Sequence, residues 1–353
     1  MTSSVEPFET NQGSRIYRIP LDTFPGFTGY AHVIVTESIT AFLDVGSGFG
    51  SSNDQLADGL ASIRSDFGEK VDWDSITHIL ISHAHIDHFG GLHFVRRNSG
   101  APIVIHALDR KVLTQYEERL ALMENRLLTF LVRAGVPPGA QEEILTLYLL
   151  NKQLFSSIEI ETTYNALGMS LDGLHFTHVP GHCPGQVVAQ VDDILLSADH
   201  ILPEISPHQS PESLSFHTGL AHYLESLERV RPLAASSRLA MGGHGKPFEN
   251  PDMRVLELVK EHRARLRKIL DLLVNPMTIA EISLSLFAEP DGYHRLLAIE
   301  EAGAHVEYLH MMGFIVVDDV SSLNSSPVVP LRFRAVEDFS QKMNEVPILE
   351  KDD

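Results

Sequence analysis

The chain has 353 residues, of which 43% are hydrophobic and 21% charged, as is usual for soluble globular proteins. Its formal net charge of -20 argues against general affinity for nucleic acid or anionic membranes, because both are bound through positive surface. No apolar run approaches the roughly 18 residues of a membrane span, and the polar, acidic start at 1–12 is no signal peptide. The single cysteine, Cys183, excludes internal disulfides and favours a cytoplasmic location.

The first third of the chain alternates strand-like and helix-like segments. We predict a flexible start at 1–14, a loop rich in Phe, Pro and Gly at 21–30, and a helix at 55–66. Strands are predicted at 15–20, 32–36, 39–45, 76–81 and 103–106. This order predicts an α/β fold.

A helical pattern occupies residues 109 to about 156. One apolar face is shared by Leu113, Tyr116, Leu120, Met123, Leu127 and Phe130. The breaker Pro137-Pro138-Gly139 interrupts the pattern, which resumes at 144–154. We interpret this segment as an insertion between strands, with external packing and an active-site lid as equal alternatives.

The remaining elements indicate a second domain. We predict a strand at 174–179, a hairpin of 187–191 with 194–198, a loop at 203–213, a helix at 214–230 and a strand at 238–241. Helices at 253–274, 278–287 and 296–312 precede strands at 314–317 and 328–336 and an acidic tail. This is the outline of a winged-helix module. With about two domains expected for this length, we predict one at 1–250, containing the 109–156 insertion, and another at 251–353.

Ligand-type side chains stand where apolar strands stop at Gly-rich turns. Seven of them share this context: His83, His85, Asp87, His88, His182, Asp199 and His244. Four lie within six positions, where two His at i and i+2 of an extended segment point the same way. The following Asp-His pair can reach a second point nearby. This pattern predicts a two-metal site, and His with carboxylate suits zinc, or alternatively iron or manganese.

The pattern resembles the signature of the metallo-β-lactamase-fold hydrolases over roughly residues 15–250. The segment His83-Ala84-His85-Ile86-Asp87-His88 matches their His-x-His-x-Asp-His motif. The later family positions match His182 after a Pro-Gly turn, Asp199 at a strand end and His244 beside a Gly. The resemblance implies an αββα sandwich with two zinc ions per chain at its edge.

The resemblance also implies a role for each matched residue. The first metal would be held by His83, His85 and His182, the second by Asp87, His88 and His244, with Asp199 between them. A metal-activated hydroxide would attack a carbonyl or phosphoryl centre. Asp87 would also act catalytically by handling a proton.

Other positions are predicted to support the site. Asp44, in a segment that fits a further family motif, would orient neighbouring ligands or cap the next helix. His200 is either a supporting or an exposed residue. Tyr30 stands in the expected substrate loop, where relatives often carry Asn-x-Tyr. We interpret Cys183 as a small buried residue whose side chain points elsewhere.

Departures from relatives narrow the function. Class B1 lactamases carry Cys at a second-metal position, whereas the chain has Asp199 at the bridging position, which argues against that class. Flavodiiron reductases carry Glu at the position of His85, which argues against that class as well. The C-terminal part resembles the winged-helix tail of the lactamase-like protein 2 and glyoxalase II-like subgroup. Its basic run at 262–268 could touch phosphates, but a solvated helix face is the favoured interpretation.

Three functions follow from these residues. The favoured one is hydrolysis of a small acyl substrate, a thioester or a lactone. The alternatives are a metal-dependent endoribonuclease on single-stranded RNA, and an iron-dependent sulfur dioxygenase or non-catalytic metal protein. The expected partner is a small molecule rather than nucleic acid or a membrane, and a homodimer is plausible.

Overall fold

The computed structural model describes residues 4–152, 155–288, 291–325 and 327–336. The chain divides into two compact units, the first made of residues 1–119, 154–207 and 226–255. The second consists of residues 120–153, 208–225 and 256–353. The last crossing between the units, at 255, lies near the predicted division at 250, but part of the predicted insertion belongs to the second unit. In the described ranges, no helix is both long and apolar enough to cross a bilayer.

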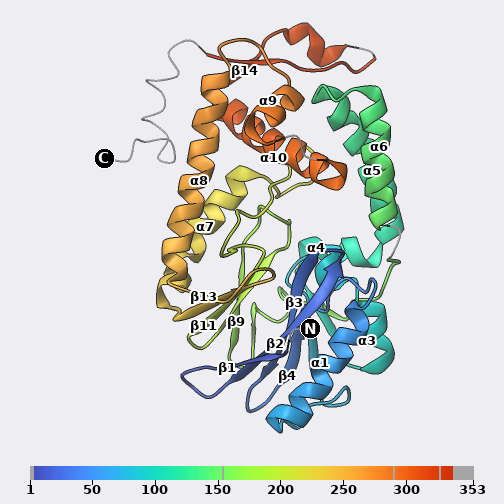
Figure 1. Ribbon diagram of the computed structural model, residues 1–353, viewed down its shortest axis with the longest axis vertical. Coiled ribbons are helices and arrows are strands. Elements are labelled where there is room, and N and C mark those ends of the chain that lie inside the picture. The colour runs from blue at the N-terminus through green and yellow to red at the C-terminus, as the bar shows by residue number, and fades with distance from the viewer. Residues whose placement is uncertain (1–3, 153–154, 289–290, 326, 337–353) are drawn as a thin grey trace. The chain divides into compact units, whose positions relative to one another are not determined.

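The first unit contains a mixed sheet of seven strands within the described ranges, in the order β1-β2-β3-β4-β5-β6-β7 (Figure 1). Its strands are β1 (Glu6–Glu9), β2 (Arg15–Phe24), β3 (Phe27–Val35), β4 (Thr40–Leu43), β5 (His78–Leu80), β6 (Ile103–Ile105) and β7 (Thr162–Thr163). β1 to β4 pair antiparallel and β4 to β7 pair parallel. Parallel neighbours need crossovers, which contain α1 (Ser52–Phe67), α2 (Ile86–Phe89), α3 (Leu92–Asn98) and α4 (Ala107–Thr114).

A second sheet faces the first, in the order β13-β12-β11-β10-β9-β8. Its strands are β8 (Ser170–Leu171), β9 (Leu174–His178), β10 (Val187–Val191), β11 (Ile194–Ala198), β12 (Leu239–Gly242) and β13 (Phe248–Glu249). The predicted hairpin is confirmed, because β10 and β11 pair antiparallel. β11 and β12 pair parallel, so their carboxyl ends meet at one edge.

Two apolar layers hold this unit together. One buries side chains such as Phe42, Leu56 and Phe89 between the first sheet and its helices. The other lies between the sheets, where Leu80 and Met241 are buried. Helix α7 (Leu220–Ser236) is tied to the loop after β9 by Ser226 Oγ, which donates to the Pro180 carbonyl at 2.7 Å. The predicted αββα sandwich is therefore confirmed.

The predicted loop at 21–30 is wrong, because β2 and β3 form a continuous hairpin there. The two strands close at Phe24 opposite Phe27. Pro25 pre-sets the first turn residue, and Gly26 adopts the positive φ of 76° that the second requires. The aromatic and glycine content that suggested a loop therefore belongs to paired strands.

Two further boundaries differ from the prediction. The expected flexible start contains β1, which pairs with β2. Helix α7 begins at Leu220 rather than at residue 214, because His217 and Gly219 both take positive φ and interrupt the helix.

The second unit is mainly helical. It includes most of α5 (Tyr116–Arg133) and of α8 (Pro251–Leu272). It also contains the whole of α6 (Pro138–Lys152), α9 (Ile279–Leu286), α10 (Gly292–Met311) and the pair β14 (Ile315–Val317) with β15 (Phe333–Ala335). Thr278 and Glu281 form a capping box that starts α9. The Ala280 N–H donates to the Ala134 carbonyl at 2.8 Å, so the part of the insertion at 120–153 packs inside this unit. The predicted tail at 337–353 lies outside the described residues.

Candidate metal centre

The seven predicted ligands gather at one edge of the first unit. His83 and His85 follow β5, while Asp87 and His88 lie on the short helix α2. The other three follow strands of the second sheet: His182 after β9, Asp199 after β11 and His244 after β12. Their donor atoms form overlapping groups: His83, His85 and His182; His83, His88 and Asp199; and Asp87, His88 and His244. The groups share members in the way that two adjacent metal positions require.

The spacing between the donor atoms fits shared metal ions. The Nε2 atom of His244 lies 3.3 Å from Asp87 Oδ2 and 3.4 Å from Asp199 Oδ2. The same Asp199 oxygen lies 3.5 Å from His88 Nε2 and 3.7 Å from His182 Nε2. Two donors on one tetrahedral zinc, each about 2.0–2.1 Å from it, lie roughly 3.3–3.5 Å apart. These contacts are long for hydrogen bonds and suitable for coordination.

Several of these atoms are buried without a hydrogen-bond partner. They are His83 Nε2, His88 Nε2, His244 Nε2 and Asp199 Oδ1. A buried polar atom without a partner is costly, so native structures rarely leave several together. A bound cation would satisfy all four, so the residues present fit a metal centre.

Asp44 organises the first-sheet side of the centre. Its Oδ1 accepts from the Ser82 N–H at 2.8 Å, and its Oδ2 accepts from Ser82 Oγ at 2.7 Å and from His88 Nδ1 at 2.8 Å. Because His88 uses Nδ1–H for this bond, Nε2 is the nitrogen left to present a lone pair to a metal. Asp44 achieves this with a positive φ of 61°, as expected of backbone strained at a functional position.

Ser82 extends the same network to His83. Its Oγ donates to Asp44 and lies 3.0 Å from His83 Nδ1, so it accepts the Nδ1 proton. This leaves His83 Nε2 free to coordinate. Ser82 was not among the predicted site residues, although its place directly before His83 was a signal.

The β2–β3 hairpin orients His244. The Nδ1 atom of His244 donates to the Thr28 carbonyl at 2.9 Å, and the ring of Phe27 packs against the imidazole with centroids 4.3 Å apart. Thr28 acts through its backbone, so its side-chain identity carried no signal in the sequence.

Asp199 reaches the centre through a tight backbone turn. Ala198 adopts a positive φ of 46° at the end of β11, where the pairing register with β12 shifts. A Cβ at Gly243 would lie 2.4 Å from Asp199 Oδ1 and 2.5 Å from His88 Cε1, so only glycine fits there. With its amide oxygen turned toward them, Gln186 accepts from the backbone N–H groups of Asp199 and His200 at 3.1 and 2.9 Å.

The other predicted residues are placed as follows. His200 is completely buried, which removes the exposed alternative, and burial lowers its pKa to about 3. Cys183 is buried as predicted, but the expectation that its thiol points away is wrong. Its sulfur lies within 4.8 Å of donor nitrogens of His83, His85 and His182.

Tyr30 braces the turn that carries His244. Its N–H donates to the Gly243 carbonyl at 3.1 Å, and its ring stacks 3.1 Å from the guanidinium carbon of Arg18. The buried Arg18 in turn donates to the Gly245 carbonyl. Tyr30 and Arg18 therefore fix the two backbone positions on either side of His244.

The electrostatics are those of a site prepared for cations. Burial disfavours the charged form of His88, but the carboxylates of Asp199 and Asp44 outweigh it and hold its pKa well above the usual range. Burial likewise opposes the charge on His244, and Asp199 raises its pKa to about 10. Against the opposing effect of burial, His88 and His244 hold the pKa of Asp87 well below its usual range. The protons on these histidines occupy the place of positive metal charge.

A second buried group of ligand-type residues in the second unit has different geometry. His262 Nδ1 lies 3.0 Å from His305 Nε2, which is a hydrogen-bond distance, and His305 Nδ1 donates to the Glu301 carbonyl at 2.7 Å. His262 Nδ1 is 4.0 Å from Glu301 Oε1, longer than the roughly 3.3–3.5 Å that separates two donors on one tetrahedral zinc. Arg265 Nη1 already neutralises Glu301 at 3.1 Å. These residues form a hydrogen-bonded chain rather than a metal cage.

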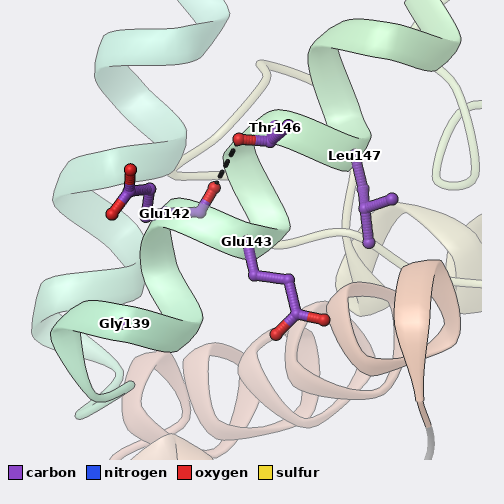
Figure 2. A pocket seen from close by; sticks show the side chains of 5 residues that line it. All are labelled: Gly139, Glu142, Glu143, Thr146 and Leu147. Carbon is purple, nitrogen blue, oxygen red and sulfur yellow. Dashed lines mark hydrogen bonds between the residues drawn. The ribbon is translucent and has the colours of Figure 1, made fainter.

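The surface depression on α6 is chemically different again (Figure 2). It is shallow and is lined by Gly139, Glu142, Glu143, Thr146 and Leu147. Thr146 Oγ1 donates to the Glu142 carbonyl at 2.8 Å, a bond internal to the helix. The predicted ligands all lie outside this depression.

Comparison with known proteins assigns the fold to a family. The sequence model of the metallo-beta-lactamase superfamily matches residues 27–242. A metallo-beta-lactamase family protein from Thermus thermophilus superposes with a TM-score of 0.71 at 24% identity, covering 91% of this chain and 98% of its own. A beta-lactamase domain protein from Burkholderia ambifaria gives 0.70 at 22% identity, covering 94% of each chain. No curated protein sequence matches. The chain belongs to the metallo-beta-lactamase superfamily, whose members are generally metal-dependent hydrolases.

Proposed function

We propose that this chain is a dinuclear metal-dependent hydrolase that acts on a small acyl substrate, a thioester or a lactone. The observation that carries the proposal is the group of buried donor atoms spaced 3.3–3.7 Å apart around Asp199 and His88. The proposed ligands of the first metal are His83, His85 and His182, and those of the second are Asp87, His88 and His244. Asp199 would contribute to both.

Two divalent ions bound there would lower the pKa of a shared water toward neutrality and polarise the scissile carbonyl. The protein's own contribution is orientation. Asp44 holds His88 and, through Ser82, His83 in the tautomer that presents Nε2. The Thr28 carbonyl does the same for His244.

Asp87 is the proposed proton acceptor. Its side chain is 14% exposed, against 9% for Asp199, so it has access to solvent as well as to the ligands. Its lowered pKa keeps it in the ionised form, so it can accept a proton but is a weaker base than an ordinary carboxylate.

The surroundings of His244 favour an apolar acyl group. Phe27, which packs on His244, is 42% exposed, and Phe49 on the neighbouring loop is 40% exposed. Phe24, at the other end of the hairpin turn from Phe27, packs against Phe49 with centroids 6.2 Å apart. Exposed aromatic rings beside a polar centre are typical of sites that bind an apolar substrate portion. The net charge of -20 disfavours a polyanion such as RNA.

The C-terminal helices support a finer family assignment. Three helices followed by the β14–β15 pair are compatible with a winged-helix module. We assign the chain to the superfamily subgroup with such a C-terminal domain. We propose zinc as the bound metal, with iron or manganese as alternatives.

Elemental analysis followed by a substrate panel tests the proposal. We expect two metal ions per chain and turnover of acyl-thioesters or lactones that is lost on chelation. Cleavage of single-stranded RNA without acyl turnover would replace it with the nuclease alternative. One iron per chain with oxygen consumption would indicate the dioxygenase instead.

A further inference from the structure

A completely buried carboxylate joins two of the ligand-bearing loops. Asp109 lies in the first turn of α4 and has 0% exposure. Its Oδ2 accepts from the Ala84 N–H at 2.9 Å, and its Oδ1 accepts from the Gly185 N–H at 2.9 Å. Ala84 stands between His83 and His85, and Gly185 follows His182 by three residues.

The position of Asp109 is not explained by the needs of its own helix. Helix α4 is capped by His106, whose side chain accepts from the Leu108 N–H. Burial raises the pKa of Asp109 to about 6, although both backbone N–H groups favour its ionised form. Burying this carboxylate is costly, and it does not cap its own helix. Its structural role is therefore the pair of hydrogen bonds to the two loops.

The loop on the far side is shaped to receive it. A Cβ at Gly185 would lie 2.7 Å from Asp109 Cγ and 2.9 Å from Asp109 Cβ. These distances are shorter than non-bonded carbon contacts allow, so a side chain at Gly185 would push the loop away from Asp109. Glycine at this position and the carboxylate at Asp109 form one contact.

We infer that Asp109 is a positioning residue that holds the His83–His85 segment and the His182 loop at the separation required by the first metal. The inference rests on the proposed metal centre. The first metal draws ligands from both loops that Asp109 joins. The second draws on Asp87, His88 and His244, none of which is on the His182 loop. Loss of Asp109 therefore weakens the first metal position more than the second.

The test uses stepwise zinc titration of the full chain against a chromogenic chelator. Asp109→Asn is isosteric, but its amide group would oppose one of the two N–H donors. We expect it to bind one zinc with wild-type affinity and the other about tenfold to a hundredfold more weakly. Gly185→Ala disrupts the same contact from the other side and should give the same pattern.

Two controls separate positioning from general destabilisation. Ile63→Ala removes a buried core side chain on α1, so it should lower the melting temperature and leave both zinc affinities unchanged. Asp44→Asn should weaken the second position most, because Asp44 contacts His88 directly and reaches His83 only through Ser82. The double variant Asp44→Asn with Asp109→Asn should then weaken both positions strongly, since each substitution acts mainly on a different one.

The outcomes are distinct. The inference is supported if Asp109→Asn and Gly185→Ala each lower the affinity for one zinc ion and the double variant lowers the affinity for both. Two wild-type affinities in Asp109→Asn, or a loss in Ile63→Ala equal to that in Asp109→Asn, overturns it while leaving the proposed function standing. Wild-type protein that takes up no metal removes the proposed function and this inference together.

Discussion

Substitution of Asp44 by Asn tests whether one buried hydrogen bond sets the tautomer of His88. Asn has the shape of Asp and tolerates the positive φ of 61° at this position, so the substitution adds no backbone strain. Its oxygen can still accept from the Ser82 N–H, which leaves its NH2 group facing His88 Nδ1. His88 Nδ1 must then accept, and the proton moves to Nε2, the atom that faces the other ligands.

The magnitude follows from the bonds that change. The bond between His88 Nδ1 and Asp44 Oδ2 is 2.8 Å long and buried, and a hydrogen bond to a charged group contributes about 1.5–3 kcal/mol. Supporting partners of metal-bound histidine typically change metal affinity by about tenfold to a hundredfold, or roughly 1.4–2.7 kcal/mol. We expect a loss in this range at the second zinc ion and a smaller loss at the first, because Asp44 reaches His83 only through Ser82.

The assay is zinc competition followed by thermal melting, with Asp172→Asn as the matched control. Asp172 also has a positive φ, 41°, and lies in the turn between β8 and β9 away from the ligands. The control should keep both zinc affinities. Wild-type affinity for both ions in Asp44→Asn would refute the reasoning that Asp44 fixes the His88 tautomer.

Three further predictions follow from the same structure. Asp199→Ala removes the oxygen that lies within 3.4–3.7 Å of three imidazoles; metal content should fall below two per chain and acyl turnover should vanish, whereas retained turnover would contradict the bridging role. Zinc uptake by metal-free protein near neutral pH should release protons from His88 and His244, because their pKa values are raised. A pH indicator in weakly buffered solution measures this release. No release on zinc addition would show that these histidines are not protonated in the metal-free protein. Although burial opposes it, Glu300 raises the pKa of His208, so this pair stabilises the fold fully below a pH of about 6.5 and loses that contribution as the pH rises through the folded pKa. The melting temperature of Glu300→Gln should therefore lie below that of the wild type by a margin that shrinks from about pH 6 to about pH 9. A margin that stays constant over this range would disprove the linkage.

The sequence by itself determined the elements that depend on short-range pattern. The apolar strand before His83 and the alternation of ligands through His88 follow from neighbouring residues, because side-chain direction along an extended segment is set by the backbone. The hairpin of 187–191 with 194–198 was predictable for the same reason, whereas the αββα architecture was implied by the resemblance to a known family. The sandwich then brings the strand ends to one edge.

Tertiary structure decided which groups complete the centre. Ser82 and the Thr28 carbonyl orient histidines through contacts that no local spacing records, and the Thr28 group is backbone, present at every position. The hairpin at 21–30 was mistaken for a loop because its turn residues and aromatic content resemble one. Pairing with the adjacent strand makes it regular.

Asp109 shows the same limit most clearly. In the sequence it is an acidic residue near the start of a predicted helix, where carboxylates are common for reasons of helix electrostatics alone. Its bonds to Ala84 and Gly185 span 25 and 76 positions of the chain. Contacts at such separation arise from the folded arrangement of β5, α4 and β9, so the structure alone could reveal that this carboxylate joins two ligand loops.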